Sequence, residues 1–145
     1  MNETTADPAI AGLNLAQGLN AEGVAALETL GTRQQVVKGD EVVMKGDDGE
    51  ALYAVLSGSI IVKAGDGRLV SVMGPGDTFG EIGFLTGSRR TANVVAQSDA
   101  ELLRLPGEAV RSLVSERPEI AAFVYSNLAR ELAKRLTTTT QMALL

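Results

Sequence analysis

The sequence predicts a mainly β domain with flanking helices, and the distribution of glycine is the first observation behind this fold class. Twelve of the 16 glycines lie between Gly31 and Gly87, and none follows Gly107. Glycine-punctuated sequence with short β-branched runs is typical of strands joined by tight turns, whereas a glycine-free segment is typical of helix. Because the strands are short and regularly spaced, we expect a small sandwich or barrel rather than a parallel sheet.

Helices are expected before the strands, within residues 13–31. Asn20 is a suitable N-cap for a helix over Ala21–Leu30, because its side-chain oxygen can accept a hydrogen bond from a backbone N–H of the first turn. We interpret residues 1–12 as a flexible N-terminal tail.

Seven strands are predicted within residues 32–105. Turn residues separate them, for example Asp66-Gly67, where glycine accepts the positive φ of a hairpin turn. The predicted strands cover residues 34–37, 41–44, 52–56, 59–64, 69–73, 93–96 and 101–105.

Two helices are predicted in the C-terminal region, residues 106–140. A short helix fits residues 107–115, and Pro118 suits the first turn of a longer one, where its missing N–H leaves no hydrogen bond unmade. Apolar residues recur there at every fourth position, so they form a stripe that slants by about 40° per step. The stripe consists of Ile120, Val124, Leu128, Leu132 and Leu136.

Composition excludes several function classes. The chain has 145 residues, which suits one domain, predicted over residues 13–145. Its 13 Lys and Arg against 18 Asp and Glu give a net charge of −5, which disfavours a nucleic-acid partner. The absence of Cys and His excludes Ser-His and Cys-His catalysis, Cys/His zinc sites and disulfides. Without a signal-peptide pattern or a membrane-length apolar run, we expect a cytoplasmic protein with no membrane partner.

The candidate chemistry lies within residues 79–92. Glycines at positions 80, 83 and 87 would allow backbone amides to approach a bound group. A short helical turn over residues 82–85 would direct its N–H groups at an anion.

Charged residues in the same segment extend this interpretation. Arg89 and Arg90 provide cations, Thr91 provides a hydroxyl, and Glu81 brings one carboxylate. An anion cradle beside a carboxylate suits a ligand that carries a phosphate and a neighbouring hydroxyl, as a nucleotide does. The structural alternative is that Glu81 and Arg90 simply form an ion pair at a turn.

This segment resembles the phosphate-binding cassette of cyclic-nucleotide-binding domains, the sensor domains of catabolite activator proteins and of cyclic-nucleotide-regulated kinases and channels. In that cassette Gly-Glu-(Ile/Leu)-(Gly/Ala) is followed by a short loop and by Arg, a small residue and Ala. The spacing of nine from Glu81 to Arg90 is similar to that of the kinase and channel branch. Residues 38–47, 52–59 and 74–81 resemble the β-roll signatures of the family, so the resemblance runs from about Gly18 to the last helix.

The resemblance implies a double-stranded β-helix (jelly roll) of eight strands, followed by a C-terminal helix pair. Glu81 would hold the ribose 2′-hydroxyl and Arg90 the cyclic phosphate. The amides of Gly83 and Ala92 and the Thr91 hydroxyl would complete the phosphate cradle. The ligand-binding residues implied for the cassette are Gly80, Glu81, Ile82, Gly83, Arg90, Thr91 and Ala92.

Three residues of the predicted sheet match positions where such domains contact the base or sugar. They are Val62, Val70 and Ser71. For Val62 and Val70 the alternative is that each is simply part of the sheet core.

The residue before the key arginine departs from the family pattern. Kinase-type cassettes often carry Pro where this chain has Arg89, so either arginine could be the anchor. The spacing and the following Thr91-Ala92 favour Arg90. We therefore expect Arg89 to be a solvated or partner-facing charge.

The residue that caps the purine base is a second position at which the chain departs from the family pattern. In the family it lies on the last helix, and counting from Pro118 suggests Arg135. The threonines at residues 138–140 are an alternative, and Arg135 could also be a plain surface charge.

The expected function is that of a non-catalytic receptor for cyclic AMP or cyclic GMP, with no cofactor and no metal. It would signal to a downstream protein through movement of the C-terminal helix. That helix has only two approximate heptads, so we expect a monomer or a weak homodimer. The alternative is a degenerate β-roll that binds a protein and no nucleotide, but such a domain should have lost Glu81 or Arg90. Catalysis is disfavoured because a phosphodiesterase needs a general base and usually metals.

Overall fold

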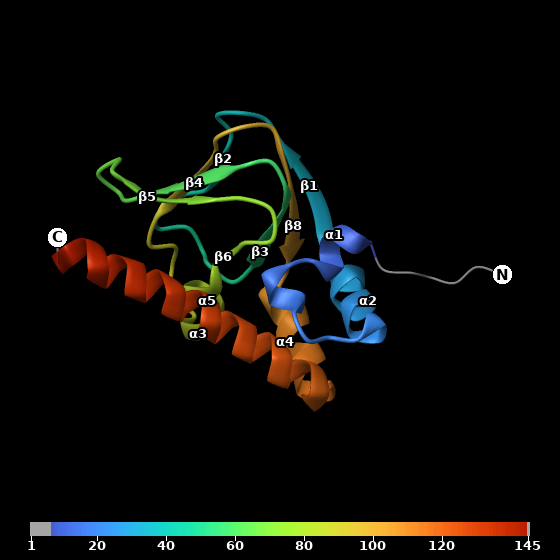
Figure 1. Ribbon diagram of the computed structural model, residues 1–145. Helices are drawn as coiled ribbons and strands as arrows, with labels where there is room; N and C mark the ends of the chain where they lie inside the picture. Colours follow the sequence, from blue (N-terminus) through green and yellow to red (C-terminus); the bar gives the residue numbers. More distant parts are fainter. Residues whose placement is uncertain (1–6, 145) are drawn as a thin grey trace.

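Among the described residues, eight strands form two four-stranded antiparallel sheets, with the helices gathered at one end (Figure 1). This computed structural model describes residues 7–144, with side chains as far as Leu136. One sheet has the order β1-β8-β3-β6 and the other β2-β7-β4-β5. The strands are β1 (Thr32–Val36), β2 (Glu41–Val43), β3 (Leu52–Ser57), β4 (Ile60–Lys63), β5 (Leu69–Met73), β6 (Thr78–Phe79), β7 (Asn93–Ala96) and β8 (Ala100–Leu105). The predicted jelly roll is confirmed.

Both faces of strand β3 are buried, and the strand therefore lies at the centre of the fold. Leu52, Ala54 and Leu56 pack in the core that the first sheet shares with the helices. Tyr53 and Val55 pack in a second core between the two sheets. Alternation along a strand directs successive side chains to opposite faces, so one short strand joins the two cores.

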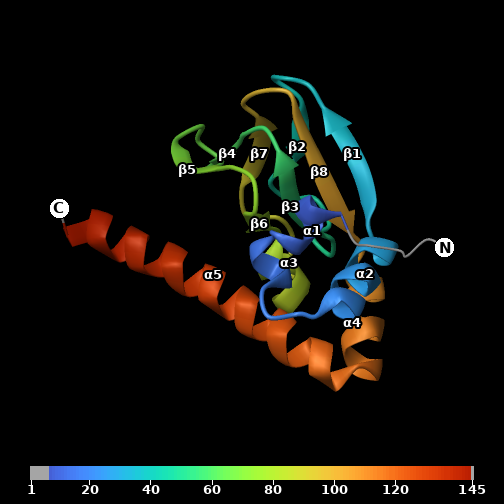
Figure 2. The ribbon, with the colours of Figure 1, turned by 45° about the vertical axis from the view of Figure 1, so that its right-hand side comes forward.

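The helices cover the outer face of the sheet that contains β3 (Figures 1 and 2). They are α1 (Pro8–Ala11), the 3₁₀ helix η1 (Asn14–Ala16), α2 (Ala21–Leu30), α3 (Glu81–Thr86), α4 (Gly107–Glu116) and α5 (Pro118–Leu144). No helix among the described residues is both long enough and apolar enough to cross a membrane.

The start of the chain differs from the prediction. The interpretation of residues 1–12 as a flexible tail is wrong for residues 7–12, because α1 forms there and Asp7 caps it by accepting the N–H of Ala9. Ile10 is fully buried in the helical core, and this apolar contact holds α1 in place. The first six residues of the predicted tail lie outside the described part of the chain.

Most predicted elements are confirmed. Each predicted strand agrees with an observed one within two residues at either end, and Asn20 caps α2 by accepting the N–H of Gly23 at 2.9 Å. Pro118 begins α5 as expected. Strand β6 has no counterpart in the prediction, because two residues carry no periodic pattern. Its pairing with β3, which places Phe79 opposite Tyr53, defines it.

The first half of helix α5 packs in the helical core, and its second half lies at the open end of the roll. In the apolar stripe Ile120, Val124 and Leu128 are buried in the helical core, whereas Leu132 is half-buried and Leu136 is exposed. In both ribbon views the helix continues past the roll on the side of β5 (Figures 1 and 2).

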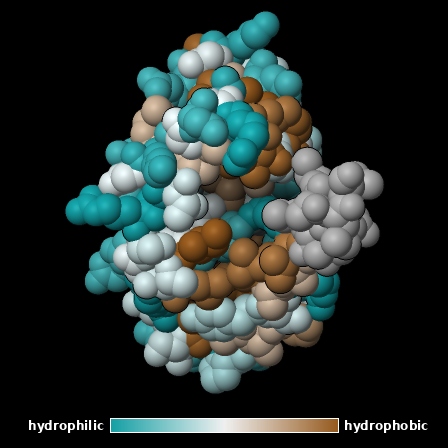
Figure 3. Space-filling view, turned by 90° about the vertical axis from the view of Figure 1, so that its left-hand side faces the viewer, coloured by the Kyte–Doolittle hydropathy of each residue, from teal (hydrophilic) through white to brown (hydrophobic). Residues whose placement is uncertain are grey.

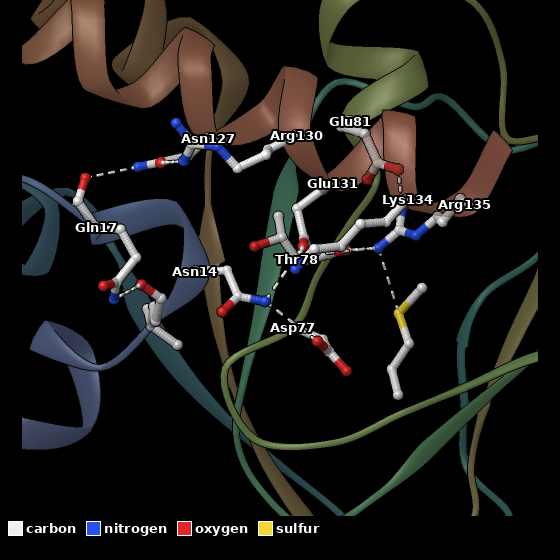
Figure 4. Close-up of polar contacts among 12 residues, drawn as sticks. Asn14, Gln17, Asp77, Thr78, Glu81, Asn127, Arg130, Glu131, Lys134 and Arg135 are labelled. Carbon is white, nitrogen blue, oxygen red and sulfur yellow. Dashed lines mark hydrogen bonds and ion pairs between the residues drawn. The ribbon is translucent and has the colours of Figure 1, made fainter. Parts of the chain in front are cut away.

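A buried polar contact fixes the middle of α5 to the N-terminal segment (Figure 4). The side-chain amide of the buried Asn127 donates to the carbonyls of Leu15 at 2.8 Å and Gln17 at 2.9 Å. One turn further along, Glu131 accepts a hydrogen bond from the Asn14 amide at 3.2 Å. These contacts set the position from which α5 crosses the end of the roll.

We expect Asn127→Ala to destabilise the domain by about 2–4 kcal/mol, because it leaves two main-chain carbonyls without their donor and removes packed atoms. Urea unfolding followed by circular dichroism measures the change. Ser126→Ala, at the adjacent exposed position, is the matched control and should change stability by less than about 0.5 kcal/mol. Equal stabilities of the two variants would contradict the assigned role of Asn127.

Candidate functional site

Helix α3 follows β6 directly and brings Glu81 to the end of the roll. Gly80, which precedes the helix, has φ +90°, a conformation that favours glycine. Gly83 packs on the main chain of Gly49, where a Cβ atom would lie 2.1 Å from the carbonyl oxygen. The glycine spacing predicted that the backbone would lie close to a bound group. At Gly83 the close neighbour is the chain's own backbone at Gly49.

The backbone of Arg90 is paired with the loop that follows β2. Its N–H donates to the carbonyl of Asp47 at 2.8 Å, and its carbonyl accepts from the N–H of Gly46 at 2.9 Å. The side chain turns inward, where Nη2 donates to the carbonyl of Ala51 at 2.8 Å and Nη1 to that of Gly80 at 3.4 Å. The loop thus holds the guanidinium beside the start of α3.

Within residues 7–136, Arg90 is a buried cation that makes no ion pair. The residue is 8% exposed, and its Nε has no hydrogen-bond partner in the protein. Burial lowers the pKa of the guanidinium below its ordinary value, although the side chain remains charged. Main-chain carbonyls satisfy this charge only in part, so the site favours an anion.

Arg89 has the opposite environment. Its side chain is 73% exposed, lies 3.4 Å from a carboxylate oxygen of Asp48, and donates to the carbonyl of Gly46 at 2.9 Å. This agrees with the expectation of a solvated charge. The two neighbouring arginines are therefore clearly distinguished by burial.

Glu81 is paired with Arg135 of α5 and not with Arg90 (Figure 4). The Arg135 guanidinium donates to Oε1 of Glu81 and to the carbonyl oxygen of Thr78. Glu81 is 3% exposed, and its other oxygen, Oε2, has no hydrogen-bond partner in the protein. The alternative of a mutual Glu81–Arg90 pair is wrong, and so is that of Arg135 as a plain surface charge. The side chains of the alternative threonines at residues 138–140 lie outside the described residues.

A pocket of about 370 Å³ lies between the second sheet, α3 and α5. Figure 3 shows the face on which the surface is hollowed, with apolar atoms around the hollow. All of the predicted binding residues line this pocket. They are Val62, Val70, Ser71, Gly80, Glu81, Ile82, Gly83, Arg90, Thr91, Ala92 and Arg135.

Seven further residues line the pocket; six of them were not predicted to do so, and the seventh, Arg89, is the alternative anchor considered above. The seven are Val43, Met73, Phe79, Arg89, Val94, Leu132 and Leu136. Four of them, Val43, Met73, Phe79 and Val94, belong to the core between the sheets. Inward-facing strand positions and the α5 stripe were the available signals, but neither indicates which part of a core is left open.

The sheet residues on the pocket wall differ in exposure. Val62 is half-buried and packs against the core between the sheets, and it lies opposite Ser71 in the β4–β5 pair. Val70 is 52% exposed, so its interpretation as sheet core is wrong. The reason is that β5 is the edge strand of its sheet and that Val70 lines an open pocket.

The pocket combines an incompletely paired cation with a carboxylate, and the two do not neutralise each other. Arg90 can accept an anion, and Glu81 can accept a hydrogen bond from a hydroxyl. Most of the remaining wall is apolar. This combination suits a ligand with a phosphate, an adjacent hydroxyl and a flat apolar group.

Comparisons with known proteins agree with this chemistry. The family model described as "Cyclic nucleotide-binding domain" matches residues 33–117, a range that contains both Glu81 and Arg90. A CRP-like cAMP-activated global transcriptional regulator of Mycobacterium tuberculosis is 31% identical over 137 residues, 92% of this chain and 59% of that protein. A cyclic AMP receptor protein of Thermus thermophilus is 36% identical over 129 residues, 86% of this chain and 58% of that protein. The chain therefore spans less than two thirds of the length of these relatives.

A solved structure has the same architecture. The N-terminal domain of a transcriptional regulator from Streptomyces coelicolor aligns with a TM-score of 0.75 at 29% identity, over 88% of this chain and 94% of that one. Fold, pocket and matched residues thus lead to one conclusion. The chain belongs to the cyclic nucleotide-binding domain family.

Proposed function

We propose that this chain is a non-catalytic receptor for a purine 3′,5′-cyclic nucleotide. The observation that carries the proposal is the buried Arg90 on the pocket wall, whose described hydrogen-bond partners are main-chain carbonyls and whose guanidinium lies 5.8 Å from the centroid of the Tyr53 ring. A cyclic phosphate would supply the negative counter-charge that is missing among the described partners of this guanidinium. Charge-assisted hydrogen bonds are roughly twice as strong as neutral ones, so Arg90 would be the main anchor.

The remaining pocket residues fit the other parts of such a ligand. Glu81 would accept a hydrogen bond from the ribose 2′-hydroxyl. The amides of Gly83 and Ala92 and the exposed Thr91 hydroxyl would complete the phosphate cradle. The purine would lie against the apolar wall, which includes the exposed Val70.

Cyclic AMP is the nucleotide that we favour, because both relatives described above carry it in their names. Both purine nucleotides offer the same phosphate and ribose, so Arg90 and Glu81 cannot discriminate between them. Discrimination must come from groups near the base, and Thr91 is the cassette's candidate. We therefore propose a site that accepts both ligands.

The signal would leave the domain through α5, which contributes Leu132, Arg135 and Leu136 to the pocket wall. A bound ligand contacts these side chains directly and so changes the position that α5 prefers. A downstream protein would respond to that position, with the chain itself acting as a monomer or a weak homodimer. We propose no nucleic-acid contact for this chain, given its net charge of −5.

Two other functions are disfavoured by specific observations. A degenerate roll that binds protein alone would not need a buried, incompletely paired arginine facing a pocket. A hydrolytic enzyme needs a general base at the phosphate. Among the lining residues Glu81 is the sole carboxylate, and its proposed partner is the ribose.

We expect Arg90→Ala to weaken cyclic AMP binding by about 30-fold to several thousand-fold, because truncating one partner of a buried charge pair costs about 2–5 kcal/mol. Isothermal titration calorimetry measures the affinity, with linear 5′-AMP as the ligand control. Arg89→Ala is the matched variant and should lose far less. Equal losses in the two variants would refute Arg90 as the anchor, and no binding by the unmodified chain would refute the proposed function.

We expect Thr91→Ala to lower cyclic GMP affinity more than cyclic AMP affinity, by a factor of about two to twelve. The Thr91 hydroxyl can bond the 2-amino group of a syn guanine, a group that adenine lacks, and one neutral hydrogen bond contributes about 0.5–1.5 kcal/mol. Parallel titrations of both nucleotides against both proteins measure the difference. If cyclic GMP affinity falls no more than cyclic AMP affinity, Thr91 has no role in discrimination.

A further inference from the structure

The Glu81 carboxylate is closed off by another part of the same chain. The residue is 3% exposed, although it lines the pocket. Oε1 is held by the guanidinium of Arg135, while Oε2 is buried and has no hydrogen-bond partner in the protein. A ligand hydroxyl can reach this carboxylate only when a covering group moves.

Arg135 is the side chain that forms an ion pair with this carboxylate. Its guanidinium connects α5 to Glu81 at the start of α3 and to the main-chain carbonyl of Thr78 in β6 (Figure 4). Nη2 also lies 3.8 Å from the sulfur of Met73 at the end of β5. The Arg135 side chain is 31% exposed and that of Glu81 is 3% exposed, so Arg135 is the more solvent-accessible partner of the pair.

A second acidic partner for Arg135 lies on its own helix. Oε1 of Glu131, four residues earlier, lies 3.8 Å from Nη2. The Glu131 side chain is 8% exposed and is held in place by the amide of Asn14 at 3.2 Å. Arg135 can therefore leave Glu81 and remain beside a fixed carboxylate, so its release does not leave the guanidinium without a counter-charge.

We propose that Arg135 is an internal competitor for Glu81 and thereby sets the affinity of the site. This inference rests on the proposed function, in which the ribose 2′-hydroxyl donates to Glu81. The guanidinium already occupies Oε1 and Oε2 is buried, so the hydroxyl can reach the carboxylate only after the Arg135 side chain has moved away. The apparent affinity is then reduced by the fraction of molecules in which the Arg135–Glu81 pair is formed.

This role differs from that expected from the family resemblance. A residue that caps the purine adds a favourable contact, and its removal weakens binding. A residue that occupies the ribose carboxylate opposes binding, and its removal strengthens it. The sign of the change in affinity therefore distinguishes the two roles of Arg135.

The test is calorimetric titration of cyclic AMP into the unmodified chain, Arg135→Gln and Arg130→Gln. Arg130 is the matched control because it is exposed, lies on α5, and makes its described hydrogen bonds to Asn127 and Ser126 of the same helix. We expect Arg135→Gln to bind roughly three- to thirty-fold more tightly than Arg130→Gln. Thermal unfolding followed by circular dichroism confirms that each variant is folded.

Two further variants test the mechanism. In a Glu81→Gln background, Arg135→Gln should give no gain in affinity, because the competed carboxylate is absent. Arg135→Lys should bind with intermediate affinity, since an ammonium keeps the charge but lacks the fork that contacts Glu81 and the Thr78 carbonyl together.

Each other result overturns the inference. Equal or weaker binding by Arg135→Gln, while the unmodified chain binds cyclic AMP, refutes competition and leaves the proposed function intact. A gain that persists in the Glu81→Gln background shows that Arg135 does not act through Glu81. If the unmodified chain binds neither cyclic AMP nor cyclic GMP, the proposed function fails and the inference fails with it.

Discussion

Strand β3 must be buried on both faces, and the positions of the other elements follow from this constraint. One face needs a second sheet, and the other needs the helices, because a continuous apolar strand cannot leave either side in water. Neighbouring β8 and the short β6 complete its hydrogen bonds. Since β6 leads directly into α3, the burial of β3 also fixes where Glu81 enters the pocket.

The site separates two opposite charges that could have neutralised each other. The loop after β2 binds the backbone of Arg90 and directs its side chain toward main-chain carbonyls. Glu81 instead meets a cation supplied by α5. Each charge is thus held by a different part of the fold. An ion pair between them would have left a neutral pocket with little reason to prefer a phosphate.

The features that could be predicted from sequence are those with local causes. Asn20 signals a helix start within four residues. The choice of Arg90 over Arg89 came from the family resemblance, and the structure shows that Arg90 is buried and Arg89 exposed. The burial of Ile10 could not be predicted, because it depends on docking against helices distant in sequence. The partner of Arg135 lies 54 residues away, and no local pattern links the two positions. Strand β6 was missed for the same reason, since only its pairing with β3 defines it.

Because α5 is anchored at Asn127, a small displacement of the helix at the pocket becomes a larger displacement at its far end. Asn127 holds the helix to the N-terminal segment, and Arg135 lies eight residues beyond it, or about 12 Å at the α-helical rise. Leu144, the last residue of α5, is seventeen residues beyond the same point, or about 26 Å. If α5 tilts as a rigid rod about Asn127, a displacement at the pocket is roughly doubled at Leu144. The position of the anchor therefore determines how much a displacement at Arg135 is amplified at Leu144. An anchor closer to Arg135 would amplify the same displacement further.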